Sequence, residues 1–75
     1  MRYRYRYPFM SEEDASWVAE DARQAVCDAG GTVEVQGVML FVFLPCIIPP
    51  SVVGRLALFA YDELLDDAGD VIEAA

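Results

Sequence analysis

The chain of 75 residues contains no histidine and no lysine. Without histidine, a serine or cysteine nucleophile lacks the base that most often activates it, and a zinc site lacks part of its usual ligand set. A glycine-rich phosphate loop is also missing, because Gly30-Gly31 follows an expected helix and does not precede one. A domain of this size has little room for a deep cleft. We therefore expect no enzyme activity, no cofactor and no metal site.

Cysteine is scarce, and Cys27 and Cys46 form no CxxC pair or ligand cluster. Two cysteines are enough for one disulfide, and the sequence leaves open whether these two pair. The first residues, MRYRYRYPF, contain no continuous apolar segment and are not typical of a secretory signal. Reduced thiols and a cytoplasmic location are therefore the expectation.

Positive charge is scarce as well. Thirteen carboxylates, from Glu12 to Glu73, outnumber five arginines, which gives a net charge of −8. Direct nucleic-acid binding needs a basic surface that replaces phosphate counterions, so it is not expected. The balance favours a protein partner with a basic surface. The simpler alternative is that the net charge only keeps a small apolar protein soluble.

The length and the hydrophobic fraction of 56% predict a single domain over residues 1–75. An uncharged stretch, residues 38–54, approaches the length of a membrane span. Pro45, Pro49 and Pro50 lie inside it and would break a spanning helix. A strand, a proline-rich connector and a helix explain these residues better, so we expect no membrane insertion.

Residues 2–9 alternate arginine with aromatic residues, and this period of two predicts a half-buried strand. Ser11 then predicts the cap of a helix, because the carboxylates Glu12-Glu13-Asp14 suit the positive end of a helix dipole. We expect this helix to run to about Ala29, where Gly30-Gly31 supply the stop.

The stretch 32–44 is rich in Val, Phe and Thr and predicts extended structure. Gln36-Gly37 marks either a hairpin turn or a bulge, and the sequence does not separate the two. After the connector 44–50, a serine can cap a second helix over 51–68, with Gly69 as its stop. The predicted fold is α+β in the order β-α-β(β)-α, a small, mainly antiparallel sheet with two helices packed on one face.

The other face of the predicted sheet has no helix left to cover it. The alternation in the first strand places Arg2, Arg4 and Arg6 there. Because residues 38–44 are apolar on both faces, Met39, Phe41 and Phe43 are expected on the same open side. Apolar character on both faces favours two-sided burial, which a homodimer provides. A homodimeric structural or adaptor module that uses this face is therefore the alternative function.

At about 100° per residue, the first helix separates a small apolar face from an acidic one. The inward face gathers Ala15, Val18, Ala19, Ala22, Ala25, Val26 and Ala29. The outward face gathers Glu13, Glu20, Gln24 and Cys27, with Asp14, Asp21 and Asp28 along its shoulder. Trp17 falls on the outward side, and a tryptophan among carboxylates is typical of an interaction hot spot. The alternative is that the tail or the sheet edge folds over it.

The second predicted helix places Phe59 in a polar arc of carboxylates. Arg55 precedes Phe59 by four residues, so either a cation–π contact or packing in a dimer could hold the ring. From Asp62 to Glu73 there are six acids and no basic residue, so we expect that these carboxylates do not pair with bases and that their mutual repulsion costs stability. The two acidic helical faces together predict partner binding at Glu13, Trp17, Glu20, Asp21, Asp28, Phe59, Asp62, Glu63, Asp66 and Asp67.

The acidic runs Glu12-Glu13-Asp14 and Asp62-Glu63 with Asp66-Asp67, on a small chain without a catalytic set, resemble a known class of proteins. The class is that of small, acidic, phage-encoded inhibitors of bacterial defence systems, the anti-CRISPR proteins. The resemblance covers size and charge over the whole chain, and no site residue is carried over from it. It implies an inhibitor in the host cytoplasm whose carboxylates imitate nucleic-acid phosphates and occupy a basic DNA- or RNA-binding groove.

Overall fold

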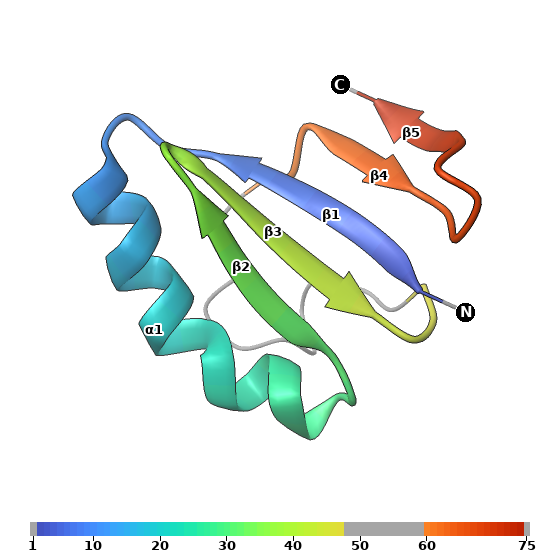
Figure 1. Cartoon of the computed structure of the whole chain (residues 1–75), viewed down its shortest axis with the longest axis horizontal. Helices are drawn as coiled ribbons and strands as arrows, with labels where there is room; N and C mark the ends of the chain where they lie inside the picture. Colours follow the sequence, from blue (N-terminus) through green and yellow to red (C-terminus); the bar gives the residue numbers. More distant parts are fainter. Residues whose placement is uncertain (1, 48–59, 75) are drawn as a thin grey trace.

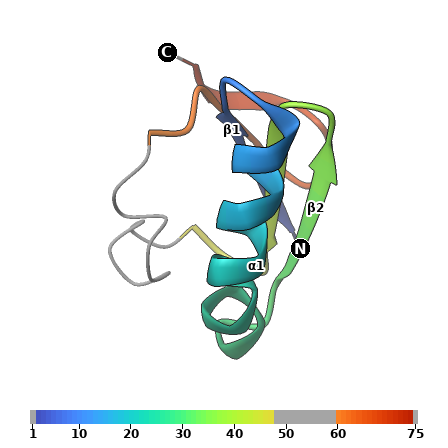
Figure 2. The same ribbon diagram turned by 90° about the vertical axis from the view of Figure 1, so that its left-hand side faces the viewer.

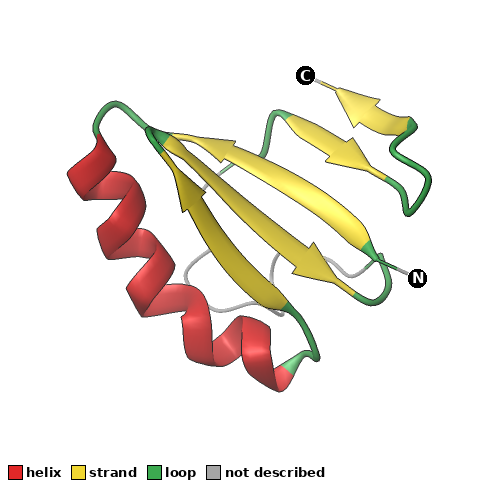
Figure 3. Ribbon diagram, in the orientation of Figure 1, coloured by secondary structure: helices red, strands yellow, loops and turns green. Residues whose placement is uncertain are grey.

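The computed structural model describes residues 2–47 and 60–74. In this part of the chain it contains one helix and one five-stranded sheet (Figures 1 and 3). The elements are β1 (Tyr3–Pro8), α1 (Glu12–Asp28), β2 (Thr32–Gln36), β3 (Met39–Leu44), β4 (Glu63–Leu65) and β5 (Val71–Ala74). The strands lie in the order β2-β3-β1-β4-β5, and neighbouring strands are antiparallel. The predicted α+β class with an antiparallel sheet is confirmed.

β1 and β2 run parallel to each other, because each is antiparallel to β3, which lies between them. α1 connects these two strands and packs against β2 and β3. Figure 2 shows the helix standing alongside β2, to one side of the sheet. This arrangement is a split βαβ unit. α1 therefore lies on one face of the sheet and not on the other.

The alternation of β1 separates its side chains as the sequence predicts. Tyr5 and Tyr7 are 3% and 2% exposed and face the core, whereas Arg4 and Arg6 are half-buried on the opposite face. β1 lies in the middle of the sheet, where proline would remove a ladder hydrogen bond. Pro8 is tolerated because it is the last residue of the strand.

Both ends of α1 are fixed by the residues that the sequence singles out. The Ser11 hydroxyl accepts a hydrogen bond from the backbone N–H of Asp14 at 3.1 Å. At the other end, Gly30 has a φ of 86°, and its N–H donates to the Cys27 carbonyl at 2.9 Å. The N–H of Gly31 donates to the Val26 carbonyl at 2.9 Å, which completes a Schellman motif.

The predicted inward face of α1 is confirmed as the one that packs on the sheet. Its buried residues are Ala15, Val18, Ala19, Ala22 and Val26. Small side chains let the helix approach β2 and β3 closely. Within residues 2–47 and 60–74, no helix is long and apolar enough to cross a membrane.

The alternative at Gln36-Gly37 is settled in favour of a hairpin turn. Gln36 pairs with Met39, so Gly37 and Val38 form a two-residue loop between β2 and β3. Gly37 has a φ of 61°, whereas Val38 does not have a positive φ. Glycine at the first loop position is what a type II′ turn requires, and this turn matches the twist of the flanking strands.

The predicted second helix is wrong for residues 60–68. Glu63–Leu65 form β4, which pairs with β1, and the chain then turns into β5. Gly69, taken as a helix stop, lies with a φ of 88° in the turn between these two strands. The remainder of that prediction, residues 51–59, and the last three residues of the connector, 48–50, lie outside the described residues.

The strand prevails because it satisfies burial and charge together. The apolar spacing at Leu64 and Leu65 fits a helix, but it also fits a short strand in which only Leu64 is buried, at 2% exposure. A helix would leave the carboxylates after Tyr61 as a run of like charges. In β4 the register instead places Glu63 opposite Arg6, next to Arg4. Long-range pairing thus removes a repulsion that a helix would keep.

The core beneath β1 is closed by an aromatic side chain from the approach to β4. The Tyr61 ring packs edge-to-face on Tyr5 and Tyr7, with centroids 4.9 and 6.0 Å away. Burial, followed by the nearby Tyr5 and Tyr61, raises the pKa of Tyr7 to about 12. The same core includes Leu40, Val42, Leu44 and Leu64.

Candidate protein-binding face on helix α1

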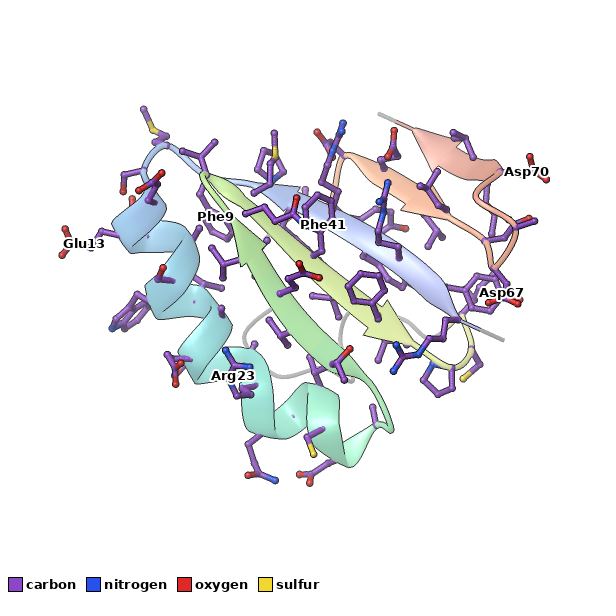
Figure 4. All side chains as sticks on the ribbon, viewed as in Figure 1. Phe9, Glu13, Arg23, Phe41, Asp67 and Asp70 are labelled. Carbon is purple, nitrogen blue, oxygen red and sulfur yellow. The ribbon has the colours of Figure 1, made fainter. Side chains whose placement is uncertain are left out.

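The outer side of α1 presents the predicted acidic stripe to solvent. Its exposed residues are Glu13, Trp17, Glu20, Asp21, Gln24, Cys27 and Asp28. Glu13 and Asp28 are fifteen residues apart, which at about 1.5 Å per residue makes the stripe about 22 Å long. In Figure 4 the labelled Glu13 points away from the helix and from the sheet. We call this set of residues the outer face of α1.

Trp17 lies near the N-terminal end of this face and is surrounded by acids. The helical neighbours of any residue are three and four positions away in each direction. For Trp17 these are Glu13, Asp14, Glu20 and Asp21, so all four neighbours are carboxylates. The tryptophan side chain is 60% exposed, which contradicts the alternative that another part of the described chain covers it.

Positive charge is nearly absent from α1. The helix carries six acids and one basic residue, Arg23. The Arg23 guanidinium lies 3.5 Å from a Glu20 carboxylate oxygen, one helical turn away. Both side chains are more than half exposed, so this pair contributes little to stability and is easily exchanged for an intermolecular one.

Asp62 and Glu63, at the start of β4, differ from the acids of α1 because they already form ion pairs within the fold. The Arg6 guanidinium donates to both carboxylate oxygens of Asp62, at 2.8 and 3.1 Å. Arg4 donates to Glu63 at 3.5 Å, and Arg6 also lies 3.9 Å from Glu63. The hydrogen bond to Asp62 raises the pKa of Arg6 above its ordinary value, and burial opposes this rise. The prediction that this acidic run does not pair with bases is therefore wrong for Asp62 and Glu63, because Arg4 and Arg6 of β1 are their partners.

The open face of the sheet carries the remaining arginine contacts. The Arg4 guanidinium lies over the Phe41 ring at 5.0 Å, and that of Arg2 over Phe43 at 5.9 Å. Figure 4 shows Phe41 on the sheet face turned towards the viewer. The predictions that the arginines and Phe41 and Phe43 share the open face are confirmed. Their cation–π contacts were missed, because they depend on the register between β1 and β3.

Asp66 stabilises the turn between β4 and β5, and Asp67 contacts the backbone just before β1. One Asp66 oxygen accepts hydrogen bonds from the backbone N–H groups of Ala68 and Asp70, both at 2.9 Å. An Asp67 oxygen accepts from the backbone N–H of Arg2 at 3.0 Å. Local hydrogen bonds such as those of Asp66 are a usual role of aspartate in turns. The binding role predicted for these two residues stays a prediction.

The structure does not bring the two predicted acidic groups together. α1 packs beside β2 and β3, whereas the second group begins at β4, on the other side of β1. In Figure 4, Glu13 lies at one end of the molecule and Asp67 and Asp70 lie at the other. Phe59 lies outside the described residues. The α1 group is exposed along its length, and Arg23 is the one basic residue of the helix.

A hollow of about 210 Å³ lies against the helix, lined by Phe9, Asp14, Trp17 and Val18. Neither in this hollow nor in the rest of the described residues is there a group of three His, Cys, Asp or Glu side chains that could hold a metal ion. Cys27 and Cys46 are free thiols and both are exposed. The chemistry that this arrangement offers is the non-covalent recognition of a cationic group.

Comparison with protein-family models, with curated proteins and with solved structures gives no match. The functional argument therefore depends on the exposure, charge and packing of the residues described above.

Proposed function

We propose that the chain is an acidic binding protein whose outer face of α1 docks on the basic surface of a protein partner. The observation that carries this proposal is Trp17, exposed on a helix and flanked on all four sides by carboxylates. Tryptophan is among the residues that contribute most to binding energy at protein interfaces. Surrounding carboxylates speed the encounter with a basic partner and select against acidic ones.

In the more specific form of the proposal, the partner is a nucleic-acid-binding complex of a host defence system, and the chain inhibits it by competition. One strand of B-DNA carries a phosphate about every 3.4 Å of axis, or roughly six over 22 Å. Glu13, Glu20, Asp21 and Asp28 supply four carboxylates over that length. The helix can therefore replace part of one strand in a basic groove. It would act in the cytoplasm, where its two free thiols remain reduced.

The direct test is displacement of a labelled DNA duplex from purified defence complexes that bind DNA, followed by fluorescence anisotropy. The wild-type chain should displace the duplex, and the variant Asp21→Arg should require at least about tenfold more protein. The matched control is Asp70→Arg, which changes the net charge equally but lies in the exposed turn before β5. If Asp21→Arg and Asp70→Arg reduce displacement equally, only the net charge of the chain matters, and the outer face of α1 is not the binding site.

A homodimer through the open sheet face is the second candidate. It is favoured by the apolar side chains that are only half-buried there, Met39, Phe41, Phe43 and Leu65. The ion pairs of Arg4 and Arg6 already compensate the charges of this face, which lowers the cost of covering it. Sedimentation equilibrium decides the question, since a monomer at all concentrations leaves this candidate without an interface.

A further inference from the structure

The hollow beside Trp17 combines three kinds of wall. Trp17 gives an exposed aromatic surface, Asp14 a carboxylate, and Phe9 and Val18 an apolar floor. An aromatic surface attracts a cation through its negative face, and a carboxylate attracts it through its charge. An apolar floor is unfavourable for a strongly hydrated ion, so it selects for a cation with a weakly hydrated body.

The floor of the hollow is held in place by the fold. The backbone N–H of Phe9 donates to the Val38 carbonyl at 2.9 Å, which ties the loop before α1 to the β2–β3 turn. Val18 is 4% exposed and belongs to the core, and Phe9 packs against that core. The hollow thus has a rigid side, and a ligand would not have to order it on binding.

Local charge gives the hollow its sign. Asp14 and Glu13 lie one turn before Trp17, and within the described part of the chain no arginine forms an ion pair with either. Glu20 and Asp21 lie one turn after it. The Arg23 guanidinium lies 3.5 Å from a Glu20 carboxylate oxygen. A cation that enters from solvent therefore meets carboxylates on every side of the ring.

We propose that this hollow is the binding site for one arginine side chain of the partner, with its guanidinium stacked on Trp17 and bonded to the Asp14 carboxylate. A planar guanidinium stacks on an aromatic face, donates to a carboxylate in a fixed geometry and is weakly hydrated. A lysine ammonium satisfies the charge but neither the stacking nor the apolar floor. The inference rests on the proposed function, because it names the group that the basic partner presents to the same face.

Trp17 is the only tryptophan of the chain, so its fluorescence reports on this site alone. The experiment titrates the full chain, at constant ionic strength, with end-blocked Gly-Gly-Arg-Gly-Gly and with the same peptide carrying citrulline or lysine. The arginine peptide should give a saturable change with a dissociation constant on the order of millimolar. Citrulline, which has the same shape without the charge, should bind about tenfold more weakly, and lysine should fall between the two.

The variants Asp14→Asn and Asp70→Asn test whether the arginine peptide binds in the hollow. Circular dichroism is used to check that both variants retain the fold. Asp14→Asn should weaken the arginine peptide several-fold, whereas Asp70→Asn should leave it unchanged. The proposal would be overturned if the citrulline peptide bound as tightly as the arginine peptide, or if Asp14→Asn left the affinity for the arginine peptide unchanged. If the lysine peptide bound as tightly as the arginine peptide, the assignment of the site to a guanidinium would be overturned.

The two proposals fail separately in this design. A chain that binds the arginine peptide at Trp17 but displaces no DNA from a basic complex supports the arginine site and contradicts the competitive function. A chain that displaces DNA through Asp21 but shows no response to the peptide supports the function and contradicts the arginine site.

Discussion

Gly31 is the residue at which the chain leaves α1 and enters β2, and β3 passes close to it. A Cβ atom built there would overlap the carbonyl oxygen of Phe43 and lie 2.9 Å from the Leu44 side chain. The backbone of a paired strand cannot move aside as a flexible side chain can. Close packing, and not only the helix stop predicted from the sequence, therefore requires glycine at this position.

We predict that Gly31→Ala lowers the free energy of unfolding by about 3 kcal/mol, measured by urea denaturation. Gly69→Ala is the control, because Gly69 has a φ of 88° but no atom within 4 Å of the added Cβ. It should cost only the strain of the left-handed conformation, about 1–2 kcal/mol. A smaller loss in Gly31→Ala than in Gly69→Ala would contradict the packing described around β3.

Tyr7 gives the stability of the fold a dependence on alkaline pH. Burial and the neighbouring tyrosines raise its pKa from 10.0 to about 12 in the folded protein. The folded state thus keeps this proton at a pH where the unfolded chain has lost it. The contribution to stability is fully present below about pH 10 and is lost as the pH rises towards 12.

The expected loss over this interval is roughly 2 kcal/mol, measured as the free energy of unfolding in urea at each pH. The chain has no lysine, so no lysine side chain titrates in this interval. Tyr7→Phe provides the control, because it removes the ionisable hydroxyl and keeps the ring. Its stability curve should be flatter between pH 10 and 12, and an equally steep curve would show that Tyr7 is not the source.

At the scale of elements, the sequence predicts what depends on near neighbours. The alternation of β1, the Ser11 cap and the glycines after α1 all act within a few residues, and each prediction is confirmed. The outer face of α1 was found in the same way, from the helical period alone. Its exposure then follows from the small residues that bury the opposite side of the helix.

The element that the sequence mispredicts is β4, and the reason is distance along the chain. Leu64 lies opposite Tyr5, fifty-nine residues earlier, and no local pattern encodes this register. The ion pairs of Asp62 and Glu63 follow from the same register, so they could not be foreseen either. Two of the acids assigned to a binding face thereby acquire partners within the fold.

β4 and the helix predicted in its place differ in the stability losses expected from mutating Leu64 and Leu65. In a helix both Leu64 and Leu65 belong to one apolar arc, whereas in β4 they point to opposite faces, and only Leu64 is fully buried. Leu64→Ala should therefore cost about 2–4 kcal/mol in urea denaturation, and Leu65→Ala about 1 kcal/mol or less. Equal losses at the two positions would favour the helical packing over β4.

At the scale of the whole molecule, the charge of −8 is unevenly distributed. Arg4 and Arg6 lie in the central strand and neutralise acids that reach them from β4. α1 keeps six acids against one arginine and lies at the far side of β2 and β3. Within the described residues, the sheet face thus carries ion pairs between β1 and the start of β4, whereas α1 has one arginine for six acids.

Binding through the outer face of α1 is tested by the dissociation constant of the chain for a purified DNA-binding complex of a host defence system, measured over a range of salt concentrations. Affinity for the wild type should fall steeply as salt rises from about 50 to 300 mM, because the contacts are between opposite charges. Asp21→Arg should weaken binding about tenfold or more at the lowest salt and less at the highest. Asp70→Arg should follow the wild type. A flat salt titration, or the same loss in both variants, would contradict binding through the outer face of α1.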